Sequence, residues 1–313
     1  MNGVVLSLPG NDRLAARLGA GLNLGVGAVG LHRFPDGEAR IQIAQRVAGK
    51  QVILAATLDR PDEKLLPLLF AASTARELGA ASVGLVAPYL AYLRQDRRFA
   101  PGQGVSARYF ARVVSAAVDW LVTVDPHLHR ISRLEELYPI PVQVVHTAPC
   151  LADWIRAHIA RPMIIGPDAE SAQWVSILAG RIGAPHALLS KRRVGDRTVD
   201  IRLPDLSACV GRQPVLVDDI ISSGATMAEA IRLLKEAGWP SPACLAVHGV
   251  FAEGAYQHLQ DAGAAAVVTS NTIPHASNQI DVLDLVIAAV APYLPASGPV
   301  AIAEASGCAS VQL

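Results

Sequence analysis

An apolar run that ends in two adjacent carboxylates constrains this chain more than any other feature. The run Val215–Val217 is followed by Asp218 and Asp219, and a turn of small and hydroxyl residues follows at Ser222–Thr226. Apolar residues at helical spacing then extend over Met227–Ala237. This order predicts a strand, a loop and a helix. The two carboxylates would stand at the carboxyl edge of a sheet, where open α/β folds bind their ligands.

The loop between this predicted strand and helix has the chemistry of an anion site. The first N–H groups of a helix have no intrahelical partner, and the helix dipole favours negative charge there. Ser222, Ser223 and Thr226 add hydroxyl donors. Gly224 and Ala225 let the backbone close around a phosphate. A phosphate site beside two carboxylates suits a phosphorylated sugar; the alternative is an acidic strand end followed by an ordinary capped helix.

Strands and helices alternate along the chain, which predicts an α/β fold with mostly parallel sheets. In the first half, the predicted strands are Val4–Leu8, Gln51–Thr57, Ser82–Ala87 and Trp120–Val124, and the predicted helices are Arg13–Leu18, Leu65–Leu78 and Ser106–Ala117. In the second half, the predicted elements include Ala148–Ala160, Cys244–Val250, Gly254–Ala262, Ala266–Ser270 and Asp281–Ala291. The repetition predicts two Rossmann-like domains, residues 1–145 and 146–295, with the site at their junction and a poorly ordered tail over residues 296–313.

Composition narrows the possible partners. The 313 residues include 27 basic and 27 acidic side chains, and a formal net charge of +0 argues against bulk electrostatic binding to nucleic acid or anionic membranes. No uninterrupted apolar stretch approaches the ~20 residues that span a bilayer, and the N-terminus lacks the pattern of a signal peptide. The four cysteines are scattered without metal-site spacing, which fits a reducing, cytoplasmic compartment.

Two stretches near the N-terminus need separate interpretations. Gly25–Gly30 matches the glycine spacing of a dinucleotide-binding fingerprint, but it follows a predicted helix and precedes Leu31–Asp36, which cannot open a helix. We therefore predict a flexible connection there. Phe34–Glu38 is predicted to be a rigid turn that carries one aromatic ring and two carboxylates, and Arg40–Ile43 alternates as an edge strand does. Taken alone, this turn is an ordinary surface turn.

Two clusters of basic residues are candidates for binding phosphate. Arg94, Arg97 and Arg98 come soon after the strand Ser82–Ala87, and arginine gives bidentate, permanently charged recognition of phosphate. Further along, a glycine-containing stretch holds four cations at Lys191, Arg192, Arg193 and Arg197. Phosphoryl-type transfer needs positive charge that arrives with the substrates, so we predict a catalytic flap there. A solvated charged loop and a solvated hairpin tip are the respective alternatives.

Acids and histidines also follow two other apolar runs. Asp125, His127 and His129 follow the strand Trp120–Val124, and another run ends at Asp168. The two histidines are two residues apart, so on a strand they would share a face. Two histidines alone are weak support for zinc, because a structural site needs further ligands. Asp168 is also well placed to cap a helix.

Together these segments resemble the ribose-phosphate pyrophosphokinase family. The stretch 215–227 is similar to the phosphoribosyl-diphosphate loop of that family and of type I phosphoribosyltransferases, and Phe34–Glu38 and Arg94–Arg98 resemble the nucleotide-binding segments of the pyrophosphokinases. The likeness covers roughly residues 3–292 and implies two tandem phosphoribosyltransferase-type domains. Many bacterial and animal members have an acid at the position of Ser222, and the short segment after Lys191 is similar to that of the archaeal-type subgroup.

The resemblance implies a role for each candidate residue. The ATP-binding residues would be Phe34, Asp36, Gly37, Glu38, Arg94, Gln95 and Asp96, with the turn at residues 34–38 holding the adenine of a neighbouring subunit. Lys191 and Arg193 would be catalytic. Ribose 5-phosphate would contact Arg193, Asp218, Asp219, Ser222, Ser223, Gly224, Ala225 and Thr226. The Mg²⁺ bound to ATP would be held by His127 and Asp168, although magnesium prefers oxygen ligands.

The implied reaction is transfer of the diphosphoryl group of ATP to the 1-hydroxyl of ribose 5-phosphate, in a cytoplasmic homo-oligomer of at least two subunits. Asp125 would support the metal site, and Asn271–His275 would shape the interface or the edge of the sugar site. A type I phosphoribosyltransferase is the first alternative, but it gives no reason for Phe34–Glu38 or Arg94–Arg98. A non-catalytic regulatory relative is the second, and it should have lost Lys191 or the paired aspartates, which are present.

Overall fold

The fold is described by a computed structural model that covers residues 2–168, 171–193 and 199–294. Within these ranges, the side chains of residues 173, 191–193 and 199–201 are not described. The predicted tail over residues 296–313 lies outside the described residues. No helix within the described ranges is both long enough and apolar enough to cross a bilayer.

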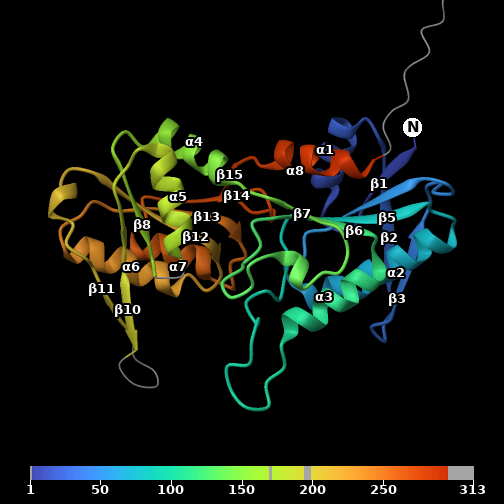
Figure 1. The fold of residues 1–313 in the computed structure, drawn as a ribbon, viewed down its shortest axis with the longest axis horizontal. Helices are drawn as coiled ribbons and strands as arrows, with labels where there is room; N and C mark the ends of the chain where they lie inside the picture. Colours follow the sequence, from blue (N-terminus) through green and yellow to red (C-terminus); the bar gives the residue numbers. More distant parts are fainter. Residues whose placement is uncertain (1, 169–170, 194–198, 295–313) are drawn as a thin grey trace, which may run out of the picture.

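The first half of the chain forms a seven-stranded sheet in the order β3-β2-β1-β4-β5-β6-β7 (Figure 1). The strands are β1 Gly3–Ser7, β2 Gly25–Arg33, β3 Ala39–Ile43, β4 Gln51–Ala55, β5 Ser82–Ala87, β6 Trp120–Val124 and β7 Val142–Val145. All neighbouring pairs are parallel except β2 and β3. The inner strands are continuous apolar runs because a parallel sheet is covered on both faces.

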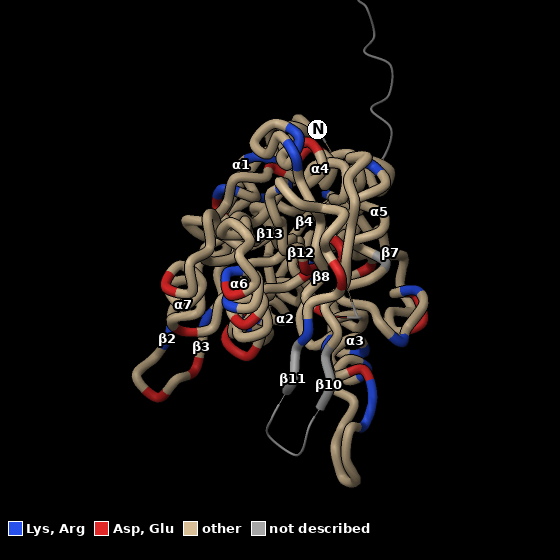
Figure 2. Tube along the Cα trace, turned by 90° about the vertical axis from the view of Figure 1, so that its left-hand side faces the viewer, with Lys and Arg blue, Asp and Glu red and all other residues tan. Residues whose placement is uncertain are grey.

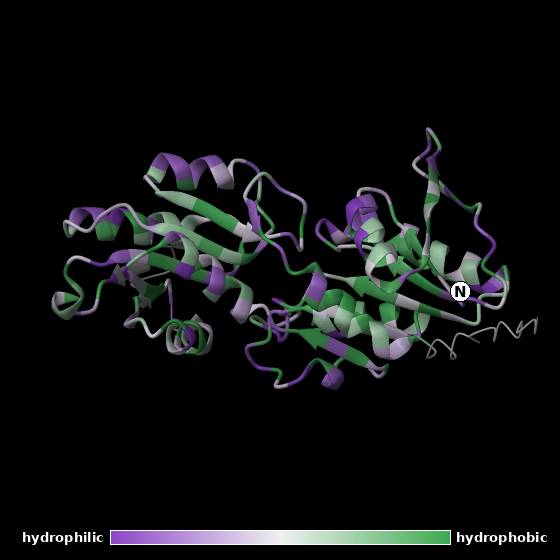
Figure 3. Cartoon of the chain, turned by 90° about the horizontal axis from the view of Figure 1, so that it is seen from above, coloured by the Kyte–Doolittle hydropathy of each residue, from purple (hydrophilic) through white to green (hydrophobic). Residues whose placement is uncertain are grey.

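The second half forms a six-stranded sheet in the order β15-β14-β13-β12-β8-β9, and every pair in it is parallel. Its strands are β8 Pro162–Gly166, β9 His186–Leu188, β12 Gln213–Ile221, β13 Ala243–Gly249, β14 Ala266–Ser270 and β15 Asn278–Ile280. A separate antiparallel hairpin is made by β10 Ser190–Arg193 and β11 Val199–Arg202. Figure 3 shows the two sheets as two lobes, with hydrophobic strands inside and helices of mixed hydropathy around them.

Helices cover both faces of each sheet (Figure 1). The α-helices are α1 Asp12–Leu22, α2 Pro61–Glu77, α3 Ser106–Ala117, α4 Ala148–His158, α5 Ala172–Ile182, α6 Ala225–Glu236, α7 Ala255–Ala262 and α8 Leu283–Val290. Three short 3₁₀ turns are described at η1 Leu134–Glu136, η3 Ser207–Cys209 and η4 Ala291–Tyr293. The predicted α/β fold with two tandem, mostly parallel sheets is confirmed.

The last α-helix of the described residues returns to the first sheet. Helix α8 packs against α1, β6 and β7, and the ring of Tyr293 in the following turn stacks on Trp120 with centroids 4.5 Å apart. Arg17 of α1 is paired with Asp281 at 2.7 Å and with Asp284 at 2.8 Å. Strand β7, the last strand of the first sheet, ends at Val145, which favours the proposed domain boundary at that residue.

The prediction of a flexible connection at residues 25–30 is wrong. Strand β2 begins at Gly25 and pairs with β1 in parallel, so the backbone groups of this stretch are satisfied by the sheet. One glycine of the stretch is required by close packing: a Cβ on Gly27 would lie 2.0 Å from Cδ of Gln45. The other predicted elements are found with shifted ends; for example, α1 continues to Leu22 instead of ending at Leu18.

Gly84 of β5 gives a prediction about stability. A Cβ at this position would lie 1.9 Å from Cε2 of Trp120, which is itself held by Tyr293. Because overpacking forces side chains from their preferred rotamers, Gly84→Ala should lower the free energy of unfolding by about 1–3 kcal/mol. Urea denaturation measures this loss. The matched control is Gly25→Ala, where a Cβ meets no atom within 4 Å, and equal losses in the two variants would contradict the packing argument.

Candidate functional site

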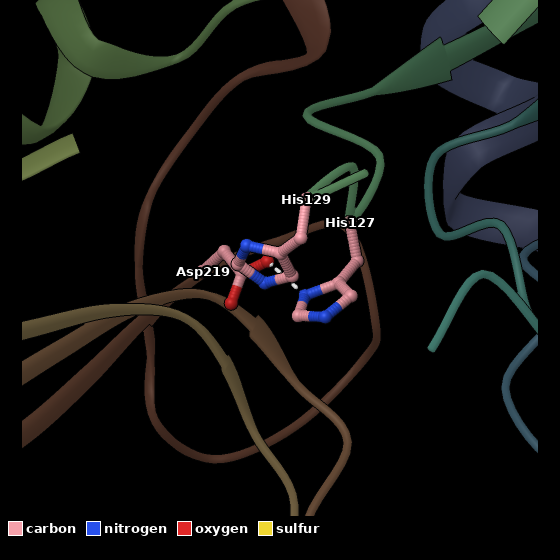
Figure 4. Close-up of side chains that lie close together, drawn as sticks. All are labelled: His127, His129 and Asp219. Carbon is pink, nitrogen blue, oxygen red and sulfur yellow. Dashed lines mark hydrogen bonds and ion pairs between the residues drawn. The ribbon is translucent and has the colours of Figure 1, made fainter. Parts of the chain in front are cut away.

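Side chains from the two sheets meet at the junction between them. His127 follows β6, and Asp219 lies near the end of β12. The Nδ1 atom of His127 is 2.5 Å from Oδ2 of Asp219, and both side chains are largely buried. The ring of His129 lies edge-on to that of His127 with centroids 4.0 Å apart. Figure 4 shows the three side chains pointing toward one another, two from a loop of the first half and one from a strand of the second.

The two adjacent aspartates have different electrostatic environments. Burial raises the pKa of Asp218 well above its ordinary value, and the negative charges of Asp219 and Asp168 raise it further. Burial would also raise the pKa of Asp219, but the hydrogen bond and the charge of His127 outweigh it, so that this pKa lies below its ordinary value. Three carboxylates therefore lie close enough to interact, and a bound cation would relieve their repulsion.

The junction contains a candidate metal site. The donor atoms of His127, His129 and Asp219 all lie within 4.8 Å of one another. Two imidazoles suit a transition metal better than Mg²⁺, which prefers oxygen ligands, but Asp218 and Asp168 add carboxylates nearby. Asp168 lies close enough to Asp218 for its charge to raise the pKa of that carboxyl, and its predicted sharing of a metal with His127 stays a prediction. His127 meets Asp219, which was predicted to contact ribose, so the site fits a divalent cation whose oxygen ligand is Asp219.

The predicted phosphate loop has the expected strand–loop–helix form. Strand β12 includes both aspartates and continues to Ile221, and α6 begins at Ala225, two residues before the predicted start. Gly224 precedes the helix with φ at 72°, a left-handed conformation that favours glycine. The Ala225 N–H is 3.5 Å from Oγ of Ser223, so the loop presents hydroxyl and amide groups side by side. This arrangement suits an anion at the helix start.

The predicted nucleotide segment lies between β5 and α3. Asp96 binds Arg130 with Nη1–Oδ1 at 3.1 Å, and Arg130 follows directly after His129. The backbone N–H of Gln95 donates to the carbonyl of Tyr92 at 3.2 Å, while Arg94 lies close enough for its charge to act on the Tyr89 phenol. Figure 2 shows basic residues gathered on the segment that precedes α3. The segment is therefore tied to the loop that carries the two histidines.

The turn at residues 34–38 lies at the other edge of the first sheet. Phe34 is 40% exposed, and its ring meets that of His32 edge-on with centroids 4.7 Å apart. The Glu38 N–H donates to Oδ1 of Asp36 at 3.0 Å, and Gly37 has φ at 92°. Strand β3 is at the sheet edge, five strand steps from β6. At about 4.8 Å per step this separates the turn from the His127 loop by roughly 24 Å.

The predicted catalytic residues lie on the hairpin beside the second sheet. Lys191 pairs with Ile201, and Arg193 pairs with Val199, in the antiparallel register of β10 and β11. The hairpin strands are thus found where the flap was predicted. Its tip, with Arg197, lies outside the described residues, as do the side chains of Lys191 and Arg193, so their roles stay predictions.

Two residues at the junction, His248 and Thr57, were not among the predicted site residues. His248 stands in β13, and Thr57 and Thr272 meet between the sheets, with Oγ1 of Thr57 2.7 Å from the carbonyl oxygen of Thr272. A single histidine within the apolar run 244–250 was the available signal for His248. Thr272 belongs to Asn271–His275, which had been expected to shape an interface or the sugar site.

Comparison with known proteins agrees with this organisation. Residues 4–117 match the family described as the N-terminal domain of ribose phosphate pyrophosphokinase, and residues 136–284 match the phosphoribosyl transferase domain. The ribose-phosphate pyrophosphokinase of Sulfolobus acidocaldarius is 33% identical over 259 residues, covering 80% of this chain and 87% of that protein. That of Methanopyrus kandleri is 32% identical over 289 residues, covering 92% of this chain and 98% of that protein.

A solved structure shares the fold. The phosphoribosylpyrophosphate synthetase from Mycobacterium smegmatis superposes with a TM-score of 0.79 at 24% sequence identity, covering 91% of this chain and 97% of that one. Both domains of the family are thus matched in one chain; the predicted phosphate loop lies within the second match, and the histidine loop lies between the two. The chain belongs to the ribose-phosphate pyrophosphokinase family.

Proposed function

We propose that this enzyme transfers the diphosphoryl group of ATP to the 1-hydroxyl of ribose 5-phosphate, giving phosphoribosyl diphosphate and AMP. The observation that carries the proposal is the 2.5 Å contact between His127 and Asp219. It joins the loop tied to the predicted nucleotide segment to the strand that leads into the predicted phosphate loop. The two reactants would therefore meet at the junction of the two sheets.

Each part of the site has a task in this reaction. The loop Ser222–Thr226 holds the 5-phosphate through amide and hydroxyl donors, and Asp218 and Asp219 accept hydrogen bonds from ribose hydroxyls. Arg94 and Gln95 hold the triphosphate, and Asp96 holds Arg130 beside them. The 1-hydroxyl oxygen attacks the β-phosphorus, the bond between that phosphorus and the oxygen of the AMP phosphate breaks, and the hydroxyl proton is lost to solvent or to phosphate. Lys191 and Arg193 neutralise charge on the transferred group, so no covalent enzyme intermediate is needed.

Magnesium is the proposed metal, held by His127 with Asp219 and with Asp168 nearby, and when bound it would neutralise charge on the triphosphate. We also propose a cytoplasmic enzyme. Cys150, Cys209 and Cys244 are free thiols, as a reducing compartment requires.

The position of Phe34 supports a site shared between two copies of the chain. The turn at residues 34–38 stands roughly 24 Å across its own sheet from the His127 loop, by the strand spacing given above. Arg94 follows β5, four strand steps or roughly 19 Å from β3 by the same spacing, so an adenine bound near Arg94 would be distant from the same chain's Phe34 and a second subunit would supply that ring. We propose at least a dimer.

Phe34→Ala should raise the KM for ATP about tenfold and leave the KM for ribose 5-phosphate unchanged, because stacking on an aromatic ring contributes about 1–3 kcal/mol per base. Steady-state kinetics with each substrate varied in turn measures both constants. The matched control is Phe70→Ala, an exposed phenylalanine on α2. A fully active monomer in sedimentation experiments would contradict the shared site.

A type I phosphoribosyltransferase is the second candidate function, supported only by the phosphate loop. The two are separated by incubation with ATP, ribose 5-phosphate and Mg²⁺, followed by nucleotide chromatography. The proposed enzyme forms AMP; formation of ADP, or of no nucleotide product, would contradict the proposal. A regulatory relative would be inactive alone and would bind an active homologue.

A further inference from the structure

His248 is a buried histidine at the centre of the junction. It stands on β13 opposite Ile220 of β12, next to the strand residue Asp219. Every other residue of β13 is apolar or glycine. A polar ring in such a strand needs partners, because an unpaired buried polar group is costly.

The partners of His248 come from three separate loops. Its Nε2 atom is 3.2 Å from the carbonyl oxygen of Asp125, at the end of β6. Its Nδ1 atom is 2.9 Å from Oγ1 of Thr272, which follows β14. Its ring meets Tyr89, which follows β5, edge-on with centroids 5.0 Å apart. One side chain of the second sheet thus touches the two first-sheet loops that lead to His127 and to Arg94.

The partners constrain the hydrogen bonds of this ring. Burial lowers the pKa of His248, which favours the neutral ring with one N–H. The Asp125 carbonyl can only accept, so Nε2 carries the proton and donates it. Nδ1 pairs with the hydroxyl of Thr272, which also lies 3.1 Å from the Val247 carbonyl oxygen. The ring is therefore oriented by two bonds, one to the Asp125 loop of the first sheet and one to the Thr272 loop of the second.

The loop that receives this bond is held in an uncommon conformation. Asp125 has φ at 31°, a positive value that is unusual for a residue other than glycine. Its carboxylate accepts from the Thr147 N–H at 2.8 Å and from Oγ1 of Thr147 at 2.5 Å, and Nδ1 of His146 is 3.0 Å away. His248 holds the backbone carbonyl of Asp125, and Thr147 and His146 hold its carboxylate. The backbone is therefore fixed two residues before His127.

A second bond crosses the junction beside the first. Oγ1 of Thr57, at the end of β4, donates to the carbonyl of Thr272 at 2.7 Å, and the Thr57 N–H donates to Oδ1 of Asn11 at 2.8 Å. The backbone carbonyl of Thr272 therefore accepts a hydrogen bond from Thr57, and its hydroxyl pairs with His248. The two bonds give the junction a fixed spacing between the sheets.

We propose that His248 is a positioning residue that sets the His127 loop against the strand carrying Asp219, and thereby aligns bound nucleotide with bound sugar phosphate. The residue need not touch either substrate. This inference rests on the proposed function for its kinetic readout. It predicts that loss of the Nε2 bond affects the nucleotide side of the site, because the phosphate loop belongs to the same sheet as His248.

Two amide variants test the bond. In His248→Gln the side-chain nitrogen reaches the place of Nε2 and can donate to Asp125; in His248→Asn the shorter amide reaches only the place of Nδ1. His248→Asn should raise the KM for magnesium–ATP about tenfold with the KM for ribose 5-phosphate unchanged. His248→Gln should restore the wild-type value to within about twofold. His258→Gln, on exposed α7, is the control that should change neither constant.

Calorimetric titration with magnesium–ATP separates failure of this inference from failure of the proposed function. If the wild-type protein forms no AMP, the proposed function fails. The Kd values from calorimetry still compare magnesium–ATP binding among the variants, so they test the positioning role separately. Weaker binding in the Asn variant with recovery in the Gln variant supports the positioning role. Equal effects in both variants, or a loss of kcat with both KM values unchanged, would overturn it, because a merely destabilised protein loses active fraction without changing affinity.

Discussion

Replacing Lys191 with alanine should lower kcat by ~10²-fold or more while leaving the KM for both substrates nearly unchanged. The expected result follows from the charge that a transferred diphosphoryl group carries in the transition state. A cation on a hairpin that meets this group only at that stage stabilises the transition state and not the bound substrates. Lys191 lies on β10, in a hairpin that stands apart from both sheets, as such a flap requires.

Steady-state kinetics of Lys191→Ala should be compared with those of Arg192→Ala, which removes a cation from the next position of the same strand. The control variant should keep most of its activity. Near-normal turnover in Lys191→Ala would remove the flap from the mechanism. Equal losses of turnover in the two variants would mean that the positive charge of the strand matters and that Lys191 has no specific role.

Replacing Asp219 with asparagine should lower kcat/KM for ribose 5-phosphate about 100-fold. Asp219 accepts from His127 and is proposed to accept from a ribose hydroxyl, and hydrogen bonds to charged groups contribute about 1.5–3 kcal/mol each. Asparagine keeps the shape of the side chain and removes its charge. The KM for ribose 5-phosphate and the Mg²⁺ concentration needed for half-maximal activity should both rise.

A double-mutant cycle with His127→Gln tests whether the contact itself carries this effect. Since the two side chains touch, the combined loss should be clearly smaller than the product of the single losses. The matched control pairs Asp219→Asn with Asp284→Asn, an exposed carboxylate on α8, where the effects should multiply. Independent effects of His127 and Asp219 would contradict a joint site.

Much of the fold could be predicted because its signals are local. Apolar runs bounded by turns gave the positions of β4, β5 and β6, and the order of strand, loop and helix after Val215 gave the phosphate loop. Gly25–Gly30 failed for a physical reason. Gly27 is required by the packing of Gln45 against the sheet, and no local pattern reports a contact with a residue on another segment of the chain.

The site was predictable in its parts and not in its assembly. His127 and Asp219 were each candidates, but their contact joins residues 92 apart in sequence, and each had been given another partner. The packing of α8 against the first sheet and the hydrogen bonds of His248 could not be predicted for the same reason: they join residues that lie far apart in the sequence. Periodicity reports which face of an element is buried; it does not report which element covers that face.

The measurement that tests the account most directly is a ³¹P NMR spectrum of the protein with ATP, ribose 5-phosphate and Mg²⁺, followed over time. We predict that the ATP resonances decrease while AMP and a diphosphate attached to carbon 1 of the ribose appear together in equal amounts. Appearance of ADP with a monophosphate on carbon 1, or loss of ATP with ribose 5-phosphate unchanged, would contradict diphosphoryl transfer at the junction of the two sheets.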